Sequence, residues 1–521
     1  DATSGHDVSG AYGLRARTRT AALNAAILPK MVRTARMTAA AVERAAIPAP
    51  LMVMRSDGGV MDVREIERRP ILTLLSGPAA GVAGALLYEH LSDGIFVEVG
   101  GTSSDCSAIR AGRPQMQPAE IGGHRTMLRT LDVRTLGIAG GSMLRVERGG
   151  IVDVGPRSAH IAGCAYAAFV APGELDGARL DPGEYATLVT REGKRVAPTT
   201  TCAANLLGYV PEGAFARGDA QAAERAFTLL ARELGGDALA LARTTLELAA
   251  GKLRVAIDRL IAEYEIDPAR VTIVGGGGGA GALVPYLAER MGASYRIARD
   301  AAVIAPIGVA LALVRDVVER TIHAPSPQEI SRIRREAADR VIAAGASPDR
   351  VEVEVEIDTQ RSKVRATASG ATALVESAVA VACDEPARRA AAAYSLGCAA
   401  EELERVELTP ALSGYARRVK RFSDLRVVDE RGAVRLALRD PVVTLTTTAK
   451  APARVRDETE RATRFGDVGR ALPALYVLRG GRIASFEGLT GTQQAVDLVT
   501  EELEGCEPDE PIALVVVPRG A

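Results

Sequence analysis

The fold of this chain is decided by one segment, Ile95-Phe96-Val97-Glu98-Val99-Gly100-Gly101-Thr102-Ser103-Ser104-Asp105-Cys106-Ser107-Ala108-Ile109. Its first five residues are mostly β-branched or aromatic, which predicts a half-buried strand. Gly100 and Gly101 then allow a sharp turn, because glycine adopts backbone conformations that other residues avoid. The residues after the turn predict a second strand.

The turn carries the groups that bind phosphate in proteins. Successive backbone N–H groups at a glycine turn form an anion-binding concavity, and Gly100 and Gly101 let a ligand approach them closely. Hydroxyl donors follow directly at Thr102, Ser103 and Ser104. We therefore predict that these five residues contact the phosphates of a bound cofactor.

Two carboxylates bracket the turn, Glu98 before it and Asp105 after it. Carboxylate oxygens suit Mg²⁺ or a positioned water, so both residues are candidate metal ligands and candidate catalytic groups. The alternative is a polar hairpin turn without a ligand, which is the more common outcome for an isolated Gly-Gly pair.

A run of five glycines, Gly275-Gly276-Gly277-Gly278-Gly279, lies between a predicted strand at residues 271–274 and a predicted helix at residues 282–291. Ordering consecutive glycines costs conformational entropy, so such a run is rare as a mere connection. A nucleotide that approaches the bare backbone at a helix N-terminus would explain it. We therefore predict cofactor contacts at Gly275, Gly276, Gly277 and Gly278, with close packing as the alternative.

Two predicted helices, residues 77–87 and 302–312, consist mainly of small residues. Small side chains let another backbone come close, so each helix is expected either in a tight helix contact or beside a ligand. A polar turn at Arg55-Ser56-Asp57-Gly58-Gly59 follows a short predicted strand, a place where α/β proteins often contact ligands.

Composition excludes several classes of function. Lys and Arg number 64 against 65 Asp and Glu, so bulk charge argues against a nucleic-acid or anionic-membrane partner. No apolar run approaches bilayer length. The six cysteines form no C-x-x-C pair and the five histidines lack ligand spacing, which argues against a zinc site and a disulfide scaffold and favours a cytoplasmic protein.

The length of 521 residues predicts more than one compact unit. Pro325-Ser326-Pro327 suggests a boundary between a core at residues 1–324 and one or two accessory α/β domains at residues 325–521. The chain opens at Asp1 in a polar segment, so we expect a fragment or a processed product with a segment upstream.

Three segments resemble the hydantoinase A and 5-oxoprolinase family, within the actin, Hsp70 and sugar-kinase ATPase superfamily: residues 54–61, 73–82 and 99–105. The resemblance covers about residues 7 to 320. It implies an α/β, ribonuclease H-like ATPase core that lacks the start of its first subdomain. It also implies ATP and Mg²⁺ as cofactors, Gly100 to Asp105 as the second phosphate loop, Gly275 to Gly279 as the adenosine loop, and the two small-residue helices as connecting helices.

The chain departs from the family pattern at four places. No acidic residue followed by Gly-Gly-Thr precedes Gly58, so the first phosphate loop is either in a detached piece or lost. Glu98 stands where the family usually has Asp. The Pro-Gly-Pro-x-Cys-Tyr segment reads as residues 161–166, Ile-Ala-Gly-Cys-Ala-Tyr, and the Thr-Asp-Ala-Asn segment reads as residues 201–205, Thr-Cys-Ala-Ala-Asn, without its acid.

The resemblance implies an ATP-dependent hydrolase or carboxylase subunit that phosphorylates an amide or enol oxygen of a small cyclic amide or ketone, together with a companion large subunit. Asp105 and Glu98 would then act on Mg²⁺ and water. Two alternatives stay open. One is an ATPase chaperone that reactivates a cobalamin-type dehydratase or mutase as its client, and the other is a degenerate paralogue that binds no nucleotide.

Overall fold

The computed structural model describes residues 3–518 except residues 10–11, 92, 111, 148, 182, 269–270, 349–350, 359, 372–382, 420–421 and 467–468. Two compact units share these residues. Unit 1 comprises Asp1–Ala79, Met116–Thr130 and Leu311–Ala521, and unit 2 comprises Ala80–Gln115 and Leu131–Ala310. Both units are mixed α/β. The predicted domain boundary after residue 324 falls inside unit 1 and stays a prediction.

Unit 2 is built on a six-stranded sheet. Its strands are, in spatial order, β16 (Ser294–Ile297), β15 (Thr272–Gly276), β3 (Gly94–Val99), β4 (Ser104–Arg110) and β5 (Arg113–Pro114), and β8 (Val133–Leu136) also pairs with β4. β15 runs parallel to β3 and to β16, whereas β3 and β4 form the antiparallel hairpin that the sequence predicted.

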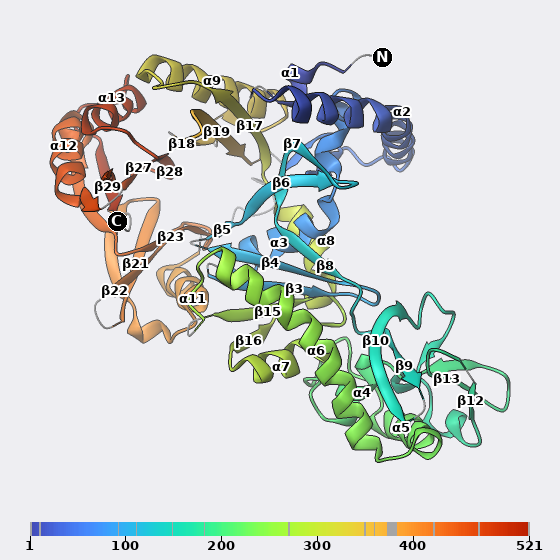
Figure 1. The fold of residues 1–521 in the computed structure, drawn as a ribbon. Helices are drawn as coiled ribbons and strands as arrows, with labels where there is room; N and C mark the ends of the chain where they lie inside the picture. The colour runs from blue at the N-terminus through green and yellow to red at the C-terminus, as the bar shows by residue number, and fades with distance from the viewer. Residues whose placement is uncertain are drawn as a thin grey trace. The chain divides into compact units, whose positions relative to one another are not determined.

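Residues of β3 alternate between the two faces of this sheet, as the period of a strand requires. Ile95, Val97 and Val99 belong to the main hydrophobic core. Two helices cover that face, α6 (Ala238–Glu263) and α7 (Ala280–Met291), of which α7 also joins β15 to β16 (Figure 1). The other face carries Phe96 and Glu98, so the charged residue is placed away from the main core.

The remaining elements of unit 2 extend from this sheet. They are the hairpin of β9 (Ser142–Glu147) and β10 (Gly150–Ser158), the sheet of β11 (Ala165–Tyr166), β14 (Arg195–Ala197), β13 (Thr187–Val189) and β12 (Arg179–Asp181), the 3-10 turns η3 (Ala167–Phe169), η4 (Pro172–Leu175) and η5 (Ala301–Val303), and the helices α4 (Thr200–Leu206) and α5 (Ala220–Leu234).

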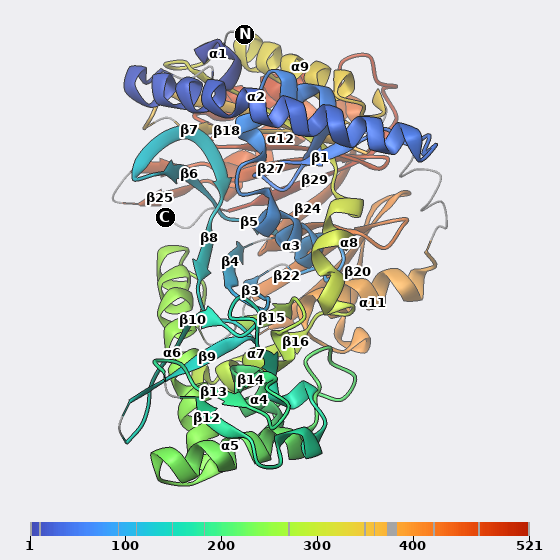
Figure 2. The ribbon, with the colours of Figure 1, turned by 90° about the vertical axis from the view of Figure 1, so that its right-hand side faces the viewer.

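The two small-residue helices cross in close contact, which confirms the structural interpretation of their composition. They are α3 (Ser76–Leu87) and α8 (Ile304–Leu311) (Figure 2). A Cβ at Gly84 would come within 2.5 Å of the carbonyl oxygen of Ile304, and a Cβ at Gly308 would collide with the carbonyl oxygen of Ala80. Glycine at these two positions therefore lets the two backbones touch.

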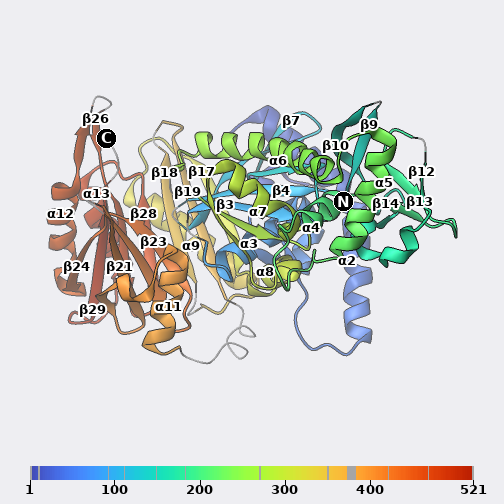
Figure 3. The same ribbon diagram turned by 90° about the horizontal axis from the view of Figure 1, so that it is seen from below.

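Unit 1 contains a nine-stranded sheet. In spatial order its strands are β1 (Met52–Met54), β2 (Val60–Asp62), β17 (Val314–Thr321), β19 (Lys363–Gly370), β18 (Glu352–Asp358), β28 (Arg482–Glu487), β27 (Ala474–Arg479), β29 (Pro511–Val517) and β24 (Val442–Thr447). Helices α12 (Ala451–Ala462) and α13 (Thr492–Glu502) pack on each other, and α12 also contacts β29 (Figure 3). A second sheet, β20 (Glu404–Thr409), β21 (Leu412–Val419), β22 (Phe422–Asp429) and β23 (Val434–Arg439), shares a hydrophobic core with β27 and β29.

The other elements of unit 1 are α1 (Gly5–Val8), α2 (Leu14–Arg44), η1 (Val63–Glu67), η2 (Pro70–Thr73), the hairpin of β6 (Met116–Ile121) and β7 (His124–Leu131), α9 (Pro327–Ala343), α11 (Glu385–Leu396), η7 (Ala400–Glu402), η8 (Thr448–Lys450), β25 (Arg464–Gly466) and β26 (Gly469–Ala471). The turn η7 stays short, because β20 begins at Glu404. Ser326, predicted near a boundary, caps α9 in a capping box with Glu329.

None of the described helices is both long enough and apolar enough to cross a bilayer. All six cysteines are free thiols.

Candidate functional site

The two predicted carboxylates face each other across neighbouring strands of unit 2. In the β3–β4 hairpin, Glu98 is the register partner of Asp105, and Asp105 is in turn the partner of Thr135 on β8. Directly opposed residues project to the same face of a sheet with Cβ atoms about 5 Å apart. The pair is therefore built by the register of the hairpin, with the hydroxyl of Thr135 donating a hydrogen bond to Asp105 Oδ1.

Both carboxyl groups resist ionisation. Burial, and then the negative charge of Asp105, raises the pKa of Glu98 to about 7. Burial also raises the pKa of Asp105, against the opposing effect of the hydrogen bond from Thr135. Among the described residues, no positively charged side chain offsets the burial of either carboxylate. A bound cation would offset the repulsion between the two carboxylates when both are ionised.

The donor set fits Mg²⁺ that arrives with a nucleotide. Within the described part of the chain, no three His, Cys, Asp or Glu side chains are grouped so that they could hold a metal ion. Mg²⁺ in phosphate-binding sites is commonly held by one or two carboxylates plus phosphate oxygens and waters. Glu98 and Asp105 supply two carboxylates beside the glycine turn, so they match this arrangement and not that of an all-protein metal cage.

Helix α3 leaves room for the side chain of Glu98, which is longer than that of the aspartate expected at this position. A Cβ added at Gly81 would collide with Oε2 of Glu98. Glutamate at this position, where the resemblance leads us to expect aspartate, therefore lies under a helix turn that has no side chain. Gly81 thus has a specific packing role next to the candidate site.

Three glycine segments of unit 2 are bonded together at the carboxyl end of β3. The N–H of Gly140 donates to the carbonyl oxygen of Gly100 (3.1 Å), and the N–H of Gly279 donates to the carbonyl oxygen of Val99 (2.9 Å). A Cβ at Gly279 would lie 2.8 Å from the carbonyl oxygen of Gly100. The predicted phosphate turn and the five-glycine run are therefore in direct backbone contact.

Part of the glycine run is explained by packing alone. A Cβ at Gly276 would lie 2.6 Å from the ring of Phe96, and one at Gly277 would collide with the carbonyl oxygen of Val99. The N–H of Gly277 is also engaged, donating to the carbonyl oxygen of Ala301 (2.7 Å). A Cβ at Gly275 would meet side chains at 3.0 Å. The packing alternative thus has direct support, and the ligand contacts stay a prediction.

The tip of the turn is its open part. Gly100, Gly101 and Thr102 are exposed and Ser103 is half-buried. The N–H of Gly100 donates within the turn to the carbonyl oxygen of Ser103 (3.0 Å). Ser104 is fully buried and its hydroxyl donates to the carbonyl oxygen of Ile138, which argues against Ser104 as a phosphate contact. The N–H groups of Gly101 and Thr102 are better placed for an anion.

Tyr166 is a site residue that sequence reasoning did not single out. A Cβ at Gly141 would collide with its hydroxyl, and one at Gly101 would lie 3.3 Å from it. Burial, and then the proximity of Cys202, raises the pKa of Tyr166, so its phenol stays a proton donor. The available signal was a second Gly-Gly pair, Gly140-Gly141, after an apolar segment.

Residues 201–205, which correspond to the family's Thr-Asp-Ala-Asn segment but lack its acid, lie in the core of unit 2. Cys202 is fully buried near the start of α4, where its sulfur lies 3.3 Å from the hydroxyl of Thr199. Burial raises the pKa of Cys202, so the thiol is not a nucleophile. Ala203 and Ala204 are buried as well, and the segment therefore serves packing in this chain.

We expect the unfolding free energy of unit 2, measured without metal, to fall as the pH rises from about 5 to about 7. The folded state keeps the proton of Glu98 up to about pH 7, whereas an unfolded glutamate releases it near its ordinary pKa. The folded state thus binds more protons in this range, and raising the pH favours unfolding. Urea titrations with a chelator at several pH values measure the trend. Glu98→Gln should flatten it, and an equal slope in this variant would assign the trend to other groups.

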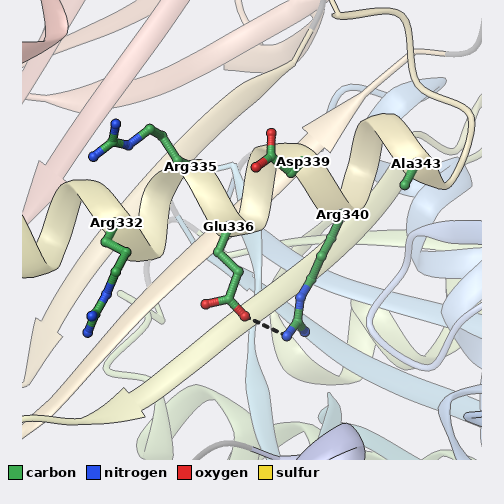
Figure 4. A pocket seen from close by; sticks show the side chains of 6 residues that line it. All are labelled: Arg332, Arg335, Glu336, Asp339, Arg340 and Ala343. Atoms are coloured by element: carbon green, nitrogen blue, oxygen red, sulfur yellow. Dashed lines mark hydrogen bonds and ion pairs between the residues drawn. The ribbon is translucent and has the colours of Figure 1, made fainter.

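One hollow of unit 1 is a charged helix surface. It lies along α9 and is lined by Arg332, Arg335, Glu336, Asp339, Arg340 and Ala343. Figure 4 shows Arg332, Glu336 and Arg340 on one side of the helix and Arg335 and Asp339 on the other. Glu336 pairs with Arg340 one turn later at 2.6 Å. These residues belong to a solvated surface, so we assign no ligand to it.

The family model for hydantoinase/oxoprolinase matches residues 17–318. The chain is 30% identical over 299 residues to caprolactamase subunit alpha of Pseudomonas jessenii, covering 56% of this chain and 40% of that protein. It is 26% identical over 334 residues to an uncharacterized protein of Methanocaldococcus jannaschii, covering 60% of this chain and 45% of that protein. These alignments therefore span less than half of either relative.

Two solved structures of ATP-dependent enzymes have a fold similar to that of this chain. The ATP-dependent caprolactamase from Pseudomonas jessenii superposes with a TM-score of 0.55 at 23% identity, over 71% of this chain and 60% of that one. Nucleotide-free acetone carboxylase superposes with a TM-score of 0.50 at 16% identity, over 84% of this chain and 66% of that one. At these identities the likeness concerns the fold alone. Because the family model matches more than half of the 521 residues, the chain belongs to the hydantoinase/oxoprolinase family.

Proposed function

We propose that this chain is the ATP-using part of an amide hydrolase or carboxylase, and that unit 2 holds the nucleotide in an actin-like or Hsp70-like manner. The observation that carries the proposal is the unpaired carboxylate pair, Glu98 and Asp105, at the base of an exposed glycine turn. Enzymes that transfer phosphoryl groups rely mainly on positioning and charge neutralisation. A site made of backbone N–H groups and two carboxylates supplies both.

Each group has a role in this proposal. The N–H groups of Gly101 and Thr102 and the hydroxyls of Thr102 and Ser103 hold phosphate oxygens. Glu98 and Asp105 hold Mg²⁺, which when bound neutralises charge on the phosphates. Gly275 to Gly278 border the adenosine. The phenol of Tyr166 lies close enough to the turn to donate a hydrogen bond to the same anion.

The caprolactamase and acetone carboxylase relatives support the proposed reaction class. The γ-phosphoryl group passes from ATP to the oxygen of a cyclic amide, or to the enol oxygen of a ketone, and ADP leaves. The activated carbon then accepts water, which opens the ring, or the activated enol carbon accepts carbon dioxide. Phosphate is released at the end, so one ATP gives one ADP and one phosphate for each turnover.

We further propose a companion subunit, since one relative is a subunit alpha. We also propose an accessory role for residues 325–521.

A substrate panel tests the proposal. ADP release from Mg·ATP is measured with hydantoin, 5-oxoproline, ε-caprolactam and acetone, with and without the companion subunit. We expect one of these classes to stimulate ADP release in proportion to the product formed. ATP turnover indifferent to every cyclic amide and ketone, but stimulated by a cobalamin enzyme, would favour a chaperone instead. Absence of Mg·ATP binding would overturn both functions.

A further inference from the structure

One aromatic ring lies exposed against the glycine run of unit 2. Phe215 belongs to the segment between α4 and α5, and 76% of its surface is exposed. A Cβ added at Gly278 would lie 2.8 Å from Cδ1 of this ring. The ring therefore lies on the bare backbone of the loop and presents most of its surface to solvent. An aromatic surface of this size gains free energy when a ligand covers it.

The segment that carries the ring is held on both sides of it. Asn205 of α4 is buried, and its Nδ2 donates to the carbonyl oxygen of Ala216 (2.9 Å) while its Oδ1 accepts from the N–H of Gly218 (2.8 Å). Arg217 Nη1 donates to the carbonyl oxygen of Val210 (2.7 Å). These bonds hold the backbone on either side of the ring before any ligand arrives, which lowers the entropic cost of binding.

The ring also has the right neighbours for a nucleotide. The glycine run that it contacts is bonded through Gly279 to Val99, the last residue before the predicted phosphate turn. Aromatic side chains are scarce in this chain, at 3% of residues, so an exposed one at this place is a specific feature. Nucleobases stack on aromatic side chains through their π faces.

We propose that Phe215 stacks on the purine base of the nucleotide and that Asn205 positions it. This inference rests on the proposed function, because it assumes that the glycine run borders a nucleotide. It makes Phe215 the residue by which the site prefers a nucleotide to a base-free polyphosphate.

Phe215→Ala tests the stacking contact directly. Isothermal titration of the full chain with Mg·ATP should show a Kd raised about tenfold, within the range known for base–aromatic stacking. Titration with Mg tripolyphosphate, which has no base, should give the same Kd for variant and wild type within about twofold. Phe465→Ala is the matched control, since Phe465 is 79% exposed in unit 1 and should leave both constants unchanged.

Phe215→Trp provides a second readout that keeps the ring. The chain contains no tryptophan, so this variant carries a single fluorophore at the proposed base site. Mg·ATP should quench or shift its emission, and Mg tripolyphosphate should not. The variant also carries the test if Phe215→Ala fails to fold.

The outcomes separate the two proposals. Equal Kd values of wild type and Phe215→Ala for Mg·ATP, or tryptophan emission that Mg·ATP leaves unchanged, would overturn the role of Phe215 and leave the proposed function standing. A wild-type chain that binds no Mg·ATP would overturn both. An equal loss of tripolyphosphate affinity in Phe215→Ala would show a damaged loop and would also overturn the stacking role.

Discussion

Asp105→Asn is expected to lower the rate constant of ATP hydrolysis about 100-fold, the scale of losing one group that stabilises transition-state charge. Asparagine keeps the size of the side chain and an oxygen that accepts the hydrogen bond from Thr135. It removes the negative charge that, in the proposed function, binds Mg²⁺ opposite Glu98. The kcat of ADP release at saturating Mg·ATP measures the effect.

Asp105→Asn should also change the pKa of Glu98, which is a second and independent measurement. The charge of Asp105 contributes to the raised pKa of Glu98, so removing it should lower the pKa of Glu98 from its value of about 7. The pH range over which the unfolding free energy, measured without metal, decreases should therefore lie lower in the variant than in the wild type. Asp258→Asn is the matched control, because Asp258 lies exposed on α6, where it pairs with Arg254. Hydrolysis by Asp105→Asn within twofold of wild type would remove Asp105 from the proposed machinery.

Elements that depend on local sequence were predictable, and long-range pairing was not. Glycine turns and runs of small or apolar residues located α3, α7, α8 and the β3–β4 hairpin, because these signals act within one element. The order of the nine-stranded sheet was not predictable, since β2 lies next to β17 although about 250 residues separate them in the chain. The sheet of β20 to β23 was also missed.

The residues of the candidate site also fall into those that local sequence predicted and those that depend on long-range contacts. Glu98 and Asp105 were found because one turn brings them into register. Thr135 and Tyr166 reach the site from other strands, so their distance from Glu98 in the sequence did not place them at the site. Phe215 was missed for the same reason, since only the folded chain places it against Gly278.

The polar turn at residues 55–59 shows where a sequence pattern misleads. Its charged residues were expected near a ligand, but Arg55 and Asp57 are buried and bonded to each other at 2.8 Å. Asp316 of β17 joins them, with Oδ1 3.5 Å from Arg55 Nη1 and Oδ2 2.9 Å from Arg69 Nη2. The turn is therefore part of a buried ion-pair network in unit 1, and the partner that decides this, Asp316, lies 261 residues from Arg55 in the sequence.

Asp316→Ala is expected to lower the unfolding free energy of unit 1 by about 3 kcal/mol, the lower end of the cost of removing one partner from a buried ion pair. The lower end applies because Arg55 keeps Asp57 and Arg69 keeps Glu65. Urea unfolding measures the loss, and hydrogen exchange in peptides from β17 assigns it to unit 1. Glu67→Ala is the control, because the pair of Glu67 with Arg36 in unit 1 is exposed on both sides and its loss should cost less than about 1 kcal/mol.

The pH dependence of the Asp316→Ala effect identifies its origin. Burial alone would raise the pKa of Asp316, but the charges of Arg55 and Arg69 outweigh burial and lower it to about 2. A carboxyl group with a depressed pKa stabilises the fold above its unfolded pKa, about 4, and loses that contribution as the pH falls toward its folded value. The difference between wild type and variant should therefore shrink between about pH 4 and pH 2. A difference that stays constant over this range would show that lost packing, and not charge, is the cause.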